Sequence, residues 1–188
     1  GKVFREANKS TNQDFVKLVD FVPYAPSYEN AASFIASPIF DGQRKVGVLI
    51  FQMPIDRINM VMTNNHKWKN CGLGESGETY IIGSDYTMRS QSRFLIEDKD
   101  GYRSQMEKLG VDKGLLNIIC AKDSTIHLQK IETNGTHAAI SGETNIEIFQ
   151  DYRHIPVLSA YAPLNIHDVN WAIMAEIDKE EALRAANT

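Results

Sequence analysis

The segment Thr79-Tyr-Ile-Ile-Gly-Ser-Asp-Tyr-Thr-Met-Arg-Ser90 decides the fold of the C-terminal part of the chain. Its apolar beginning predicts a strand over Thr79–Ile82, and Gly83-Ser84-Asp85 supplies residues that favour a tight turn. Tyr86–Ser90 then predicts a second strand that returns beside the first. The segment therefore indicates an antiparallel β-hairpin.

The N-terminal part carries a similar pattern. Ala31–Phe40 and Val46–Gln52 predict two strands joined by the turn residues Asp41-Gly42, with at least one buried face because the second strand is almost entirely apolar. Asp56 is a candidate N-cap of a helix that extends to about Trp68. Residues 1–56 otherwise offer few strands and almost no helix, so we expect this module to be incomplete.

The remaining sequence alternates between helical and strand patterns. A charged segment up to about Leu116 is compatible with helix and should cover a sheet face. Further strands are expected at 136–140, 147–150, 157–163 and 171–176, and Asp178 is expected to cap a final helix over 179–186. Antiparallel hairpins interrupted by one long helical excursion predict an α+β fold with sheets flanked by helices.

Composition narrows the possible functions. Of the 188 residues, 43% are hydrophobic and 23% are charged, which is typical of a soluble globular protein. The net charge of −4 and the scattered Lys and Arg residues argue against a nucleic-acid partner, which would need a basic surface. No stretch approaches the roughly 20 apolar residues of a membrane span.

Two long segments carry a family resemblance. The run Gly72-Leu-Gly-Glu-Ser-Gly-Glu-Thr-Tyr-Ile-Ile-Gly-Ser-Asp-Tyr-Thr-Met-Arg-Ser-Gln-Ser-Arg-Phe94, with Asp151–Tyr161 and Trp171–Ala182 downstream, resembles the membrane-proximal module of double-Cache sensor domains. Residues 23–28, 32–40 and 46–60 are similar to the second half of a membrane-distal module. The resemblance implies two tandem PAS-like (Cache, PDC) modules. Residues 1–66 would be the C-terminal portion of the distal module with its connecting helix, and residues 67–188 the proximal module with its C-terminal helix.

The resemblance also implies a function. Such domains are the periplasmic or extracellular portions of inner-membrane receptors, namely chemoreceptors, histidine kinases or cyclases. The intact receptor would be tethered to the membrane and homodimeric, and it would transmit the binding of a small molecule through the C-terminal helix. Two departures from the family pattern are informative. The Arg-x-Trp-Tyr core of amino-acid-binding members is missing, which argues against an amino acid, and His154 replaces the Gly of the usual Asp-Tyr-Arg-Gly turn.

Candidate ligand-binding residues occur in both modules. In the proximal module, Arg89 and Ser90 lie at the end of the predicted Tyr86 strand beside Tyr80, and Tyr161 could form the opposite wall. An arginine here could pair with a small carboxylate ligand. Equally, Arg89 could be solvated and Tyr161 a core tyrosine. In the distal module, hydroxyls and rings adjoin a predicted strand, although they could serve packing alone; these residues are Tyr24, Tyr28, Ser33 and Phe34.

No catalytic residue, cofactor or metal is predicted. Gly72–Gly77 matches the letters of a dinucleotide fingerprint, but a strand does not precede it and a helix does not follow it, so we interpret it as a flexible turn between modules. The five histidines lack metal-ligand spacing. Cys71 and Cys120 could form a disulfide or be small buried hydrophobic residues, and we predict that they bind no metal. The alternatives to a sensor are a small periplasmic hydrolase and a dimerisation module that binds nothing.

Overall fold

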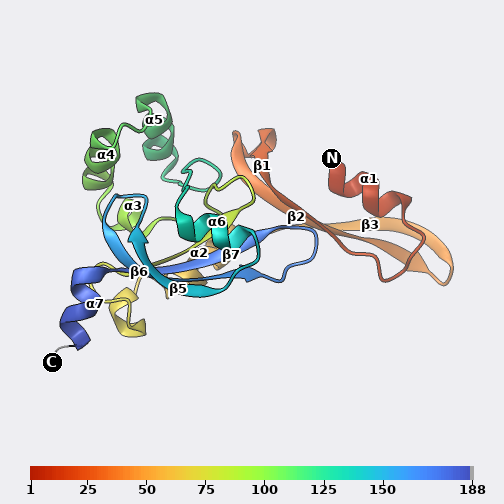
Figure 1. Cartoon of the computed structure of the whole chain (residues 1–188). Coiled ribbons are helices and arrows are strands. Elements are labelled where there is room, and N and C mark those ends of the chain that lie inside the picture. The colour runs from red at the N-terminus through yellow and green to blue at the C-terminus, as the bar shows by residue number, and fades with distance from the viewer. Residues whose placement is uncertain (187–188) are drawn as a thin grey trace. The chain divides into compact units, whose positions relative to one another are not determined.

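The computed structural model describes residues 1–186 of the chain, which form two compact units (Figure 1). Unit 1 comprises Gly1–Ile55 and Ile166–Val169, and unit 2 comprises Asp56–Asn165 and the chain from Asn170 onward. Each unit contains one sheet, and all strand pairs in both sheets are antiparallel. The prediction of an α+β fold with antiparallel sheets is therefore confirmed.

Unit 1 is a three-stranded sheet with strand order β1-β2-β3 and one helix packed on it. Its elements are α1 (Lys2–Lys9), β1 (Lys17–Tyr24), the 3-10 turn η1 (Ala25–Ser27), β2 (Asn30–Asp41) and β3 (Arg44–Gln52). The predicted hairpin is present as β2 and β3, which pair up to Asp41 and Arg44. The expectation of almost no helix here was wrong: α1 buries only Val3 and Ala7, whose i, i+4 spacing gives too short an apolar stripe to stand out in the sequence.

Strand β3 is more exposed than its composition suggested. Along its length no residue is fully buried, and Val46, Leu49 and Phe51 leave 53%, 45% and 59% of their surfaces exposed. It is also an edge strand. The small core of unit 1 lies instead where α1 meets β2 at Ala36.

Unit 2 is built on a four-stranded sheet with strand order β4-β7-β6-β5. Its strands are β4 (Glu78–Gly83), β5 (Asn145–Gln150), β6 (Pro156–Leu164) and β7 (Trp171–Asp178). Its helices are α2 (Ile55–Met62), η2 (Trp68–Cys71), α3 (Arg93–Glu97), α4 (Lys99–Lys108), α5 (Lys113–Lys122), α6 (Asn134–Ile140) and α7 (Lys179–Ala186). The last three predicted strands and the final helix are thus confirmed.

Helix α2 is shorter than predicted. It ends at Met62 because Asn64, Asn65 and His66 adopt positive φ angles of 47°, 55° and 62°, which break the helix before Trp68. The side chain of Asn59 accepts a hydrogen bond from the backbone N–H of Gln91 at 2.9 Å. Helix α2 is therefore bonded into unit 2, and the two compact units divide after its first residue, Ile55. The module boundary expected between residues 66 and 67 stays a prediction.

Two predicted strands were wrong. Tyr86–Ser90 forms only isolated bridges, Ile82 with Met88 and Thr87 with Lys130, and no continuous ladder along the open edge of β4. Residues 136–140 form α6 instead of a strand. A capping box starts this helix: the Thr133 hydroxyl accepts from the Thr136 N–H at 3.2 Å, and the Thr136 hydroxyl accepts from the Thr133 N–H at 2.9 Å.

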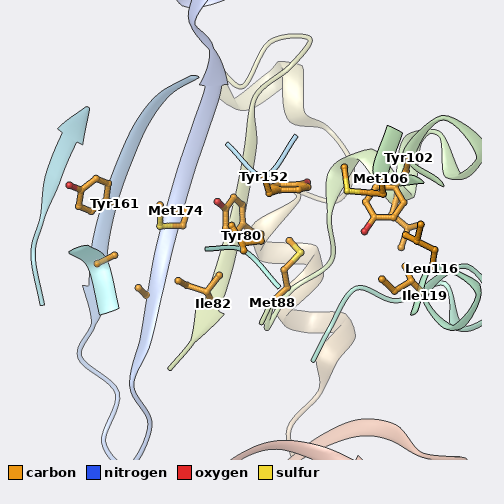
Figure 2. Packing of buried hydrophobic residues seen from close by; sticks show 14 residues of the cluster. Tyr80, Ile82, Met88, Tyr102, Met106, Leu116, Ile119, Tyr152, Tyr161 and Met174 are labelled. Carbon is orange, nitrogen blue, oxygen red and sulfur yellow. The ribbon is translucent and has the colours of Figure 1, made fainter. Parts of the chain in front are cut away.

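The main core of unit 2 lies between the inner face of its sheet and the helices. Figure 2 shows Tyr161, Met174 and Tyr80 in one row across three strands, which agrees with their register. Helix α6 packs on β5, β6 and β7, while α4 and α5 contribute further core side chains, including Met106 and Leu116. The inner face of this sheet is therefore a closed, helix-covered surface of the kind on which a ligand site can be built.

Candidate ligand-binding site

The inner face of the unit 2 sheet carries an unusual buried polar row. Glu78 on β4 lies directly opposite Glu176 on β7, and Glu176 lies opposite Ser159 on β6. All three residues are at most 4% exposed. Side chains alternate between the two faces of a strand, so this row shares the core face with Tyr80, Met174 and Tyr161. Two carboxylates are thus placed side by side in the interior of the unit.

Glu78 is held by neutral donors. One carboxylate oxygen accepts from the Tyr152 hydroxyl at 2.8 Å and the other from the backbone N–H of Arg93 at 2.6 Å. The Tyr152 hydroxyl also lies 2.9 Å from the Ser92 hydroxyl. Burial raises the pKa of Glu78 to about 7, because loss of water disfavours the charged form more than these hydrogen bonds favour it.

Glu176 is even less favourably placed for a charge. Its carboxylate accepts from the Ser159 hydroxyl at 3.1 Å and adjoins the hydroxyl of fully buried Tyr80. Among the described residues, the Tyr80 hydroxyl makes no hydrogen bond of ordinary geometry; its approach to Glu176 favours the charged carboxylate but does not outweigh the effect of burial. Burial, together with the negative charges of Asp151 and Glu78, raises the pKa of Glu176 to about 8.

The turn after β5 supplies an arginine, Arg153, whose positive charge acts on Glu78. Arg153 pairs with buried Asp151 at 2.6 Å and with Asp178, the last residue of β7, also at 2.6 Å. Its guanidinium stacks over the ring of Phe94 at 3.9 Å from the ring centre. Arg153 thereby ties the turn to the point where β7 passes into α7.

A cavity of about 380 Å³ opens beside this turn. Its walls come from the start of α6, the end of β5 and the turn that follows; they are Glu132, Thr133, Asn134, Phe149, Gln150, Asp151, Tyr152 and His154. Tyr152 connects the cavity to the buried row through its bond to Glu78. His154 has a φ of 59°, a left-handed backbone conformation that glycine adopts without strain. The lining of the cavity combines aromatic residues with several polar ones, as small-molecule sites do.

A second hollow lies on the outer face of the same sheet. This groove of about 540 Å³ is lined mainly by small and apolar residues, among them Ile146, Ala160, Ala162, Ile173 and Ala175. Its lining includes Asn145 and Thr144 but no charged residue. Because it offers few groups that could orient a ligand, the polar cavity near Tyr152 is the better candidate site.

The Gly72–Gly77 loop is an organised element and not merely a flexible turn. The Arg93 guanidinium donates to the carbonyls of Gly77 at 2.5 Å and Gly74 at 3.1 Å. From the other side, the Glu181 carboxylate of α7 accepts from the N–H groups of Glu75 and Ser76, both at 2.8 Å. The loop therefore clasps the first turn of α7.

The predicted proximal residues do not converge on one pocket. Tyr80 and Tyr161 share the inner face on either side of Met174. The Arg89 guanidinium packs against Gly83, whose missing Cβ would point away from the Tyr80 face, and it pairs with Asp85 at 3.0 Å. The Ser90 hydroxyl accepts from the N–H of Ile81 at 3.0 Å and is fully buried.

The predicted distal residues are likewise divided between surfaces. Tyr24 and Phe34 meet edge to face, with ring centres 4.9 Å apart. Ser33 points to the other face of β2, where its hydroxyl donates to the carbonyl of Val19 at 2.7 Å. Tyr28 is 91% exposed and has a left-handed backbone. The structure thus brings two of these four residues together.

Neither cysteine interpretation is supported. Cys71 and Cys120 are free thiols; Cys71 is exposed and Cys120 half-buried, so they are neither linked nor buried.

In residues 1–186, no group of three or more His, Cys, Asp or Glu side chains could hold a metal ion. Over the same range, no helix combines the length and the apolar character required to cross a membrane.

Sequence reasoning missed Glu78, Glu176 and Tyr152. A signal was present for the first two, since each glutamate occupies an inward position in a strand that is otherwise apolar on that face. Their pairing across β4 and β7 depends on a register between segments about a hundred residues apart, which the sequence does not display.

Comparison with known proteins gives a consistent fold. No protein-family model matches the sequence, and neither does any curated protein. Among solved structures, the periplasmic sensory domain of the Campylobacter jejuni chemoreceptor Tlp1 matches with a TM-score of 0.59 at 13% identity, covering 97% of this chain and 56% of that one. The fold is that of a chemoreceptor sensory domain.

Two further chemoreceptor domains support this fold. The ligand-binding domain of Pseudomonas aeruginosa PAO1 PctC, in complex with GABA, matches with a TM-score of 0.54 at 10% identity over 95% of this chain and 61% of that chain. The ligand-binding domain of Pseudomonas fluorescens CtaA, in complex with L-isoleucine, matches with a TM-score of 0.52 at 12% identity, covering 97% of this chain and 59% of that chain. The chain therefore spans about three fifths of the length of these domains, and the predicted resemblance to chemoreceptor-type sensor domains is confirmed at the level of fold.

Proposed function

We propose that this chain is an extracytoplasmic sensor domain of a transmembrane signalling receptor and that it binds a small polar molecule without chemically changing it. The observation that carries the proposal is the cavity beside Tyr152, in a fold shared with ligand-binding domains of chemoreceptors. Its wall contains amide, hydroxyl, imidazole, carboxylate and aromatic groups, and Tyr152 links it to Glu78, a carboxyl with a raised pKa of the kind that functional sites often contain.

The proposed signal leaves through α7. A ligand that contacts Tyr152 and the Asp151–His154 turn would act on Arg153, which is bonded to Asp178 directly before α7. The ligand can shift α7 only if it binds one arrangement of this turn more tightly than another. In the intact receptor, which we propose to be homodimeric and membrane-tethered at the periplasmic face, this shift would move the following segment.

We also propose a tandem arrangement, in which unit 1 belongs to a membrane-distal Cache-like module and unit 2 is the membrane-proximal one. The exposed apolar side chains of edge strand β3 support the idea that unit 1 is part of a larger module. The distal residues Tyr24, Tyr28, Ser33 and Phe34 then form a second candidate ligand surface. The proximal prediction stays a further proposal, with Arg89 as the partner of a ligand carboxylate and Ser90, Tyr80 and Tyr161 as further contacts, although these residues do not line one pocket.

A melting screen tests the function. The wild-type protein is heated with separate compounds from a panel of amino acids, small carboxylates, amines, sugars and nucleosides, because a compound that binds only the native state raises the melting temperature. A compound that does so is then titrated calorimetrically into wild type and three variants: His154→Asn, Gln150→Ala and Arg89→Ala. Asparagine is chosen at 154 because it tolerates the left-handed backbone.

The expected result is a five- to fiftyfold weaker affinity for Gln150→Ala or His154→Asn, equivalent to about 1–2.3 kcal/mol, with Gln52→Ala in unit 1 as an unaffected control. A loss confined to Arg89→Ala would move the site to the predicted Arg89 pocket. Turnover of the compound would favour the hydrolase. A panel without any hit, together with concentration-dependent dimerisation, would favour the dimerisation module.

A further inference from the structure

Glu78 and Glu176 form a buried pair, and in the described part of the chain neither carboxylate is paired directly with a cation. Side chains directly opposite each other on antiparallel strands have Cβ atoms about 4.5–5.5 Å apart, so two ionised carboxylates here would repel at short range. The hydrogen bonds that they accept come from the hydroxyls of Tyr152 and Ser159 and from the backbone N–H of Arg93. None of these donors carries a compensating positive charge.

The surrounding charged and titratable groups do not change this balance. Glu78 faces Tyr102 of α4, Tyr152 and Arg153 of the turn, and Tyr80 and Glu176 of the sheet, whereas Glu176 faces Asp151, Glu78 and Tyr80. Arg153 is already bonded to Asp151 and Asp178. The guanidinium of Arg93 is directed to Gly74, Gly77 and Glu97. The hydroxyl of Tyr80, fully buried and without a hydrogen bond of ordinary geometry to the described residues, adds a second polar group that adjoins Glu176.

We propose that the Glu78–Glu176 pair is a proton-binding site that links ambient pH to the base of helix α7. Bound protons neutralise the two carboxylates, as a paired cation would otherwise do. The pair releases these protons as the pH rises through the neutral range. Release leaves two negative charges beside Asp151 in the interior. The strands β4 and β7 then separate locally, or water enters between them, because buried carboxylates of like charge cannot remain in contact unsolvated.

Two sets of contacts carry this change to α7. Glu78 is bonded to the backbone of Arg93, whose side chain holds the Gly72–Gly77 loop, and that loop holds Glu181 of α7. Glu176 lies two positions before Asp178, whose N–H donates to the Ser76 hydroxyl at 3.1 Å and whose carboxylate pairs with Arg153. Both routes meet at Ser76, so the amide groups of Ser76 and Asp178 report on the base of α7.

The sign of the effect follows from linkage. In the folded protein the pKa is about 7 for Glu78 and about 8 for Glu176, whereas the ordinary glutamate pKa is 4.5. Between pH 4.5 and these values the folded protein therefore still binds protons that the unfolded chain has released. Stability from these groups is therefore complete below pH 4.5 and is lost as the pH rises through about 7 and then 8.

Carbon-detected NMR of the glutamate side chains, together with amide NMR of the same samples between pH 4.5 and 9, tests the proposal. The Glu78 and Glu176 carboxyl signals, assigned with Glu78→Gln and Glu176→Gln, should titrate in the neutral to mildly alkaline range. The amide signals of Ser76 and Asp178 should move with the same midpoints. In Glu176→Gln the higher midpoint should vanish from both sets, whereas Glu143→Gln, which removes an exposed carboxylate, should change neither.

Wild type alone can overturn the proposal, because finding that every glutamate carboxyl signal titrates in the ordinary range requires neither a variant nor an assignment. Carboxyl signals that titrate in the ordinary range of glutamate would remove the proton site. Neutral-range titration of the carboxyls without movement of the Ser76 and Asp178 amides would remove the link to α7, as would an unchanged amide response in Glu176→Gln. None of these outcomes depends on the small-molecule ligand, so the two proposals fail independently.

Discussion

At the residue scale, Asp168 shows how one carboxylate organises unit 1. Its two oxygens accept from the Lys17 ammonium at 2.7 Å and from the Leu18 N–H at 3.0 Å, although its backbone has a positive φ of 76°. Partial burial opposes the charge, but these hydrogen bonds lower the pKa of Asp168 to about 2. The charged form is therefore part of the folded structure.

Asp168→Asn should reduce the stability of unit 1 by about 1–2 kcal/mol at neutral pH, because asparagine keeps the backbone conformation but loses the charge-assisted bonds. Hydrogen exchange at the Leu18 amide measures this directly. The difference from wild type should be present above pH 3.8 and vanish as the pH falls towards 2. Asp41→Asn, at an exposed position, serves as the control; equal exchange in all three proteins would contradict the assigned role.

Gly83 tests what Arg89 does. A Cβ at Gly83 would lie 2.2 Å from Nη2 of Arg89, which is 2% exposed and held by Asp85 and Thr87. If Arg89 is fixed in this way, Gly83→Ala should cost about 1–3 kcal/mol by overpacking. Urea unfolding measures it when followed by tryptophan fluorescence, which reports on unit 2 through Trp68 and Trp171, and by far-ultraviolet circular dichroism, which reports on both units.

Gly47→Ala is the matched control for Gly83→Ala. There the new methyl group would meet only the Ile39 side chain, at an ordinary 3.8 Å, so little loss is expected. If Gly83→Ala proved equally harmless, the guanidinium would be free to move aside. That result would contradict the structural role and would strengthen the prediction that Arg89 meets a ligand.

Residue roles were harder to predict than residue positions. The sequence pointed to Arg89, Ser90 and Tyr80 because they adjoin one another along a predicted hairpin. The backbone of Arg89 does pair with β4, donating to Ile81 at 2.6 Å, but its side chain packs away from the Tyr80 face. Residues that a predicted hairpin would place side by side are thus separated when the side chain of one of them lies on the opposite face.

At the element scale, the clasp between α7 and the Gly72–Gly77 loop is the contact most directly tied to signalling. The Ser76 hydroxyl, the Ser76 N–H and the Glu75 N–H all donate to the Glu181 carboxylate, at 2.5–2.8 Å. These hydrogen bonds lower the pKa of Glu181, and the bond from the Ser76 hydroxyl has the largest effect. The clasp should therefore hold at neutral pH and loosen in acid as Glu181 is protonated.

Glu181→Gln should release this clasp in part, because glutamine has one acceptor oxygen and no charge. We expect roughly tenfold faster hydrogen exchange at the Ser76 amide, which corresponds to about 1.4 kcal/mol of local stability. Glu180→Gln makes the same charge change at the neighbouring, exposed position and should leave Ser76 unaffected. Unchanged Ser76 exchange in Glu181→Gln would show that the clasp does not hold α7.

Elements with strong periodic patterns were predicted well, and those set by capping or by distant partners were not. Strands β2, β3, β6 and β7 follow from their apolar runs. Helix α6 was mistaken for a strand because Thr136–Ile140 contains residues common in strands, while its true signal was the capping box of Thr133 and Thr136. Helix α1 went unrecognised because its buried stripe is only two residues long.

At the scale of the whole molecule, the chain consists of two antiparallel α+β units, and the candidate cavity lies in unit 2. The α+β class and the resemblance to sensory domains could be predicted from local patterns and long motifs. The buried carboxylate row and the cavity could not, because they arise from the pairing of β4 with β7 and from a turn that only the folded chain brings beside them.

The most direct test of the sensor account is amide NMR of the wild-type protein titrated with a compound that raises its melting temperature. The account predicts saturable shifts that concentrate at Thr133, Gln150, Tyr152 and His154 and extend to Ser76 at the base of α7. Saturable shifts confined to unit 1 or to the outer groove at Ala160, or a screen and titration in which no compound moves any resonance, would contradict it.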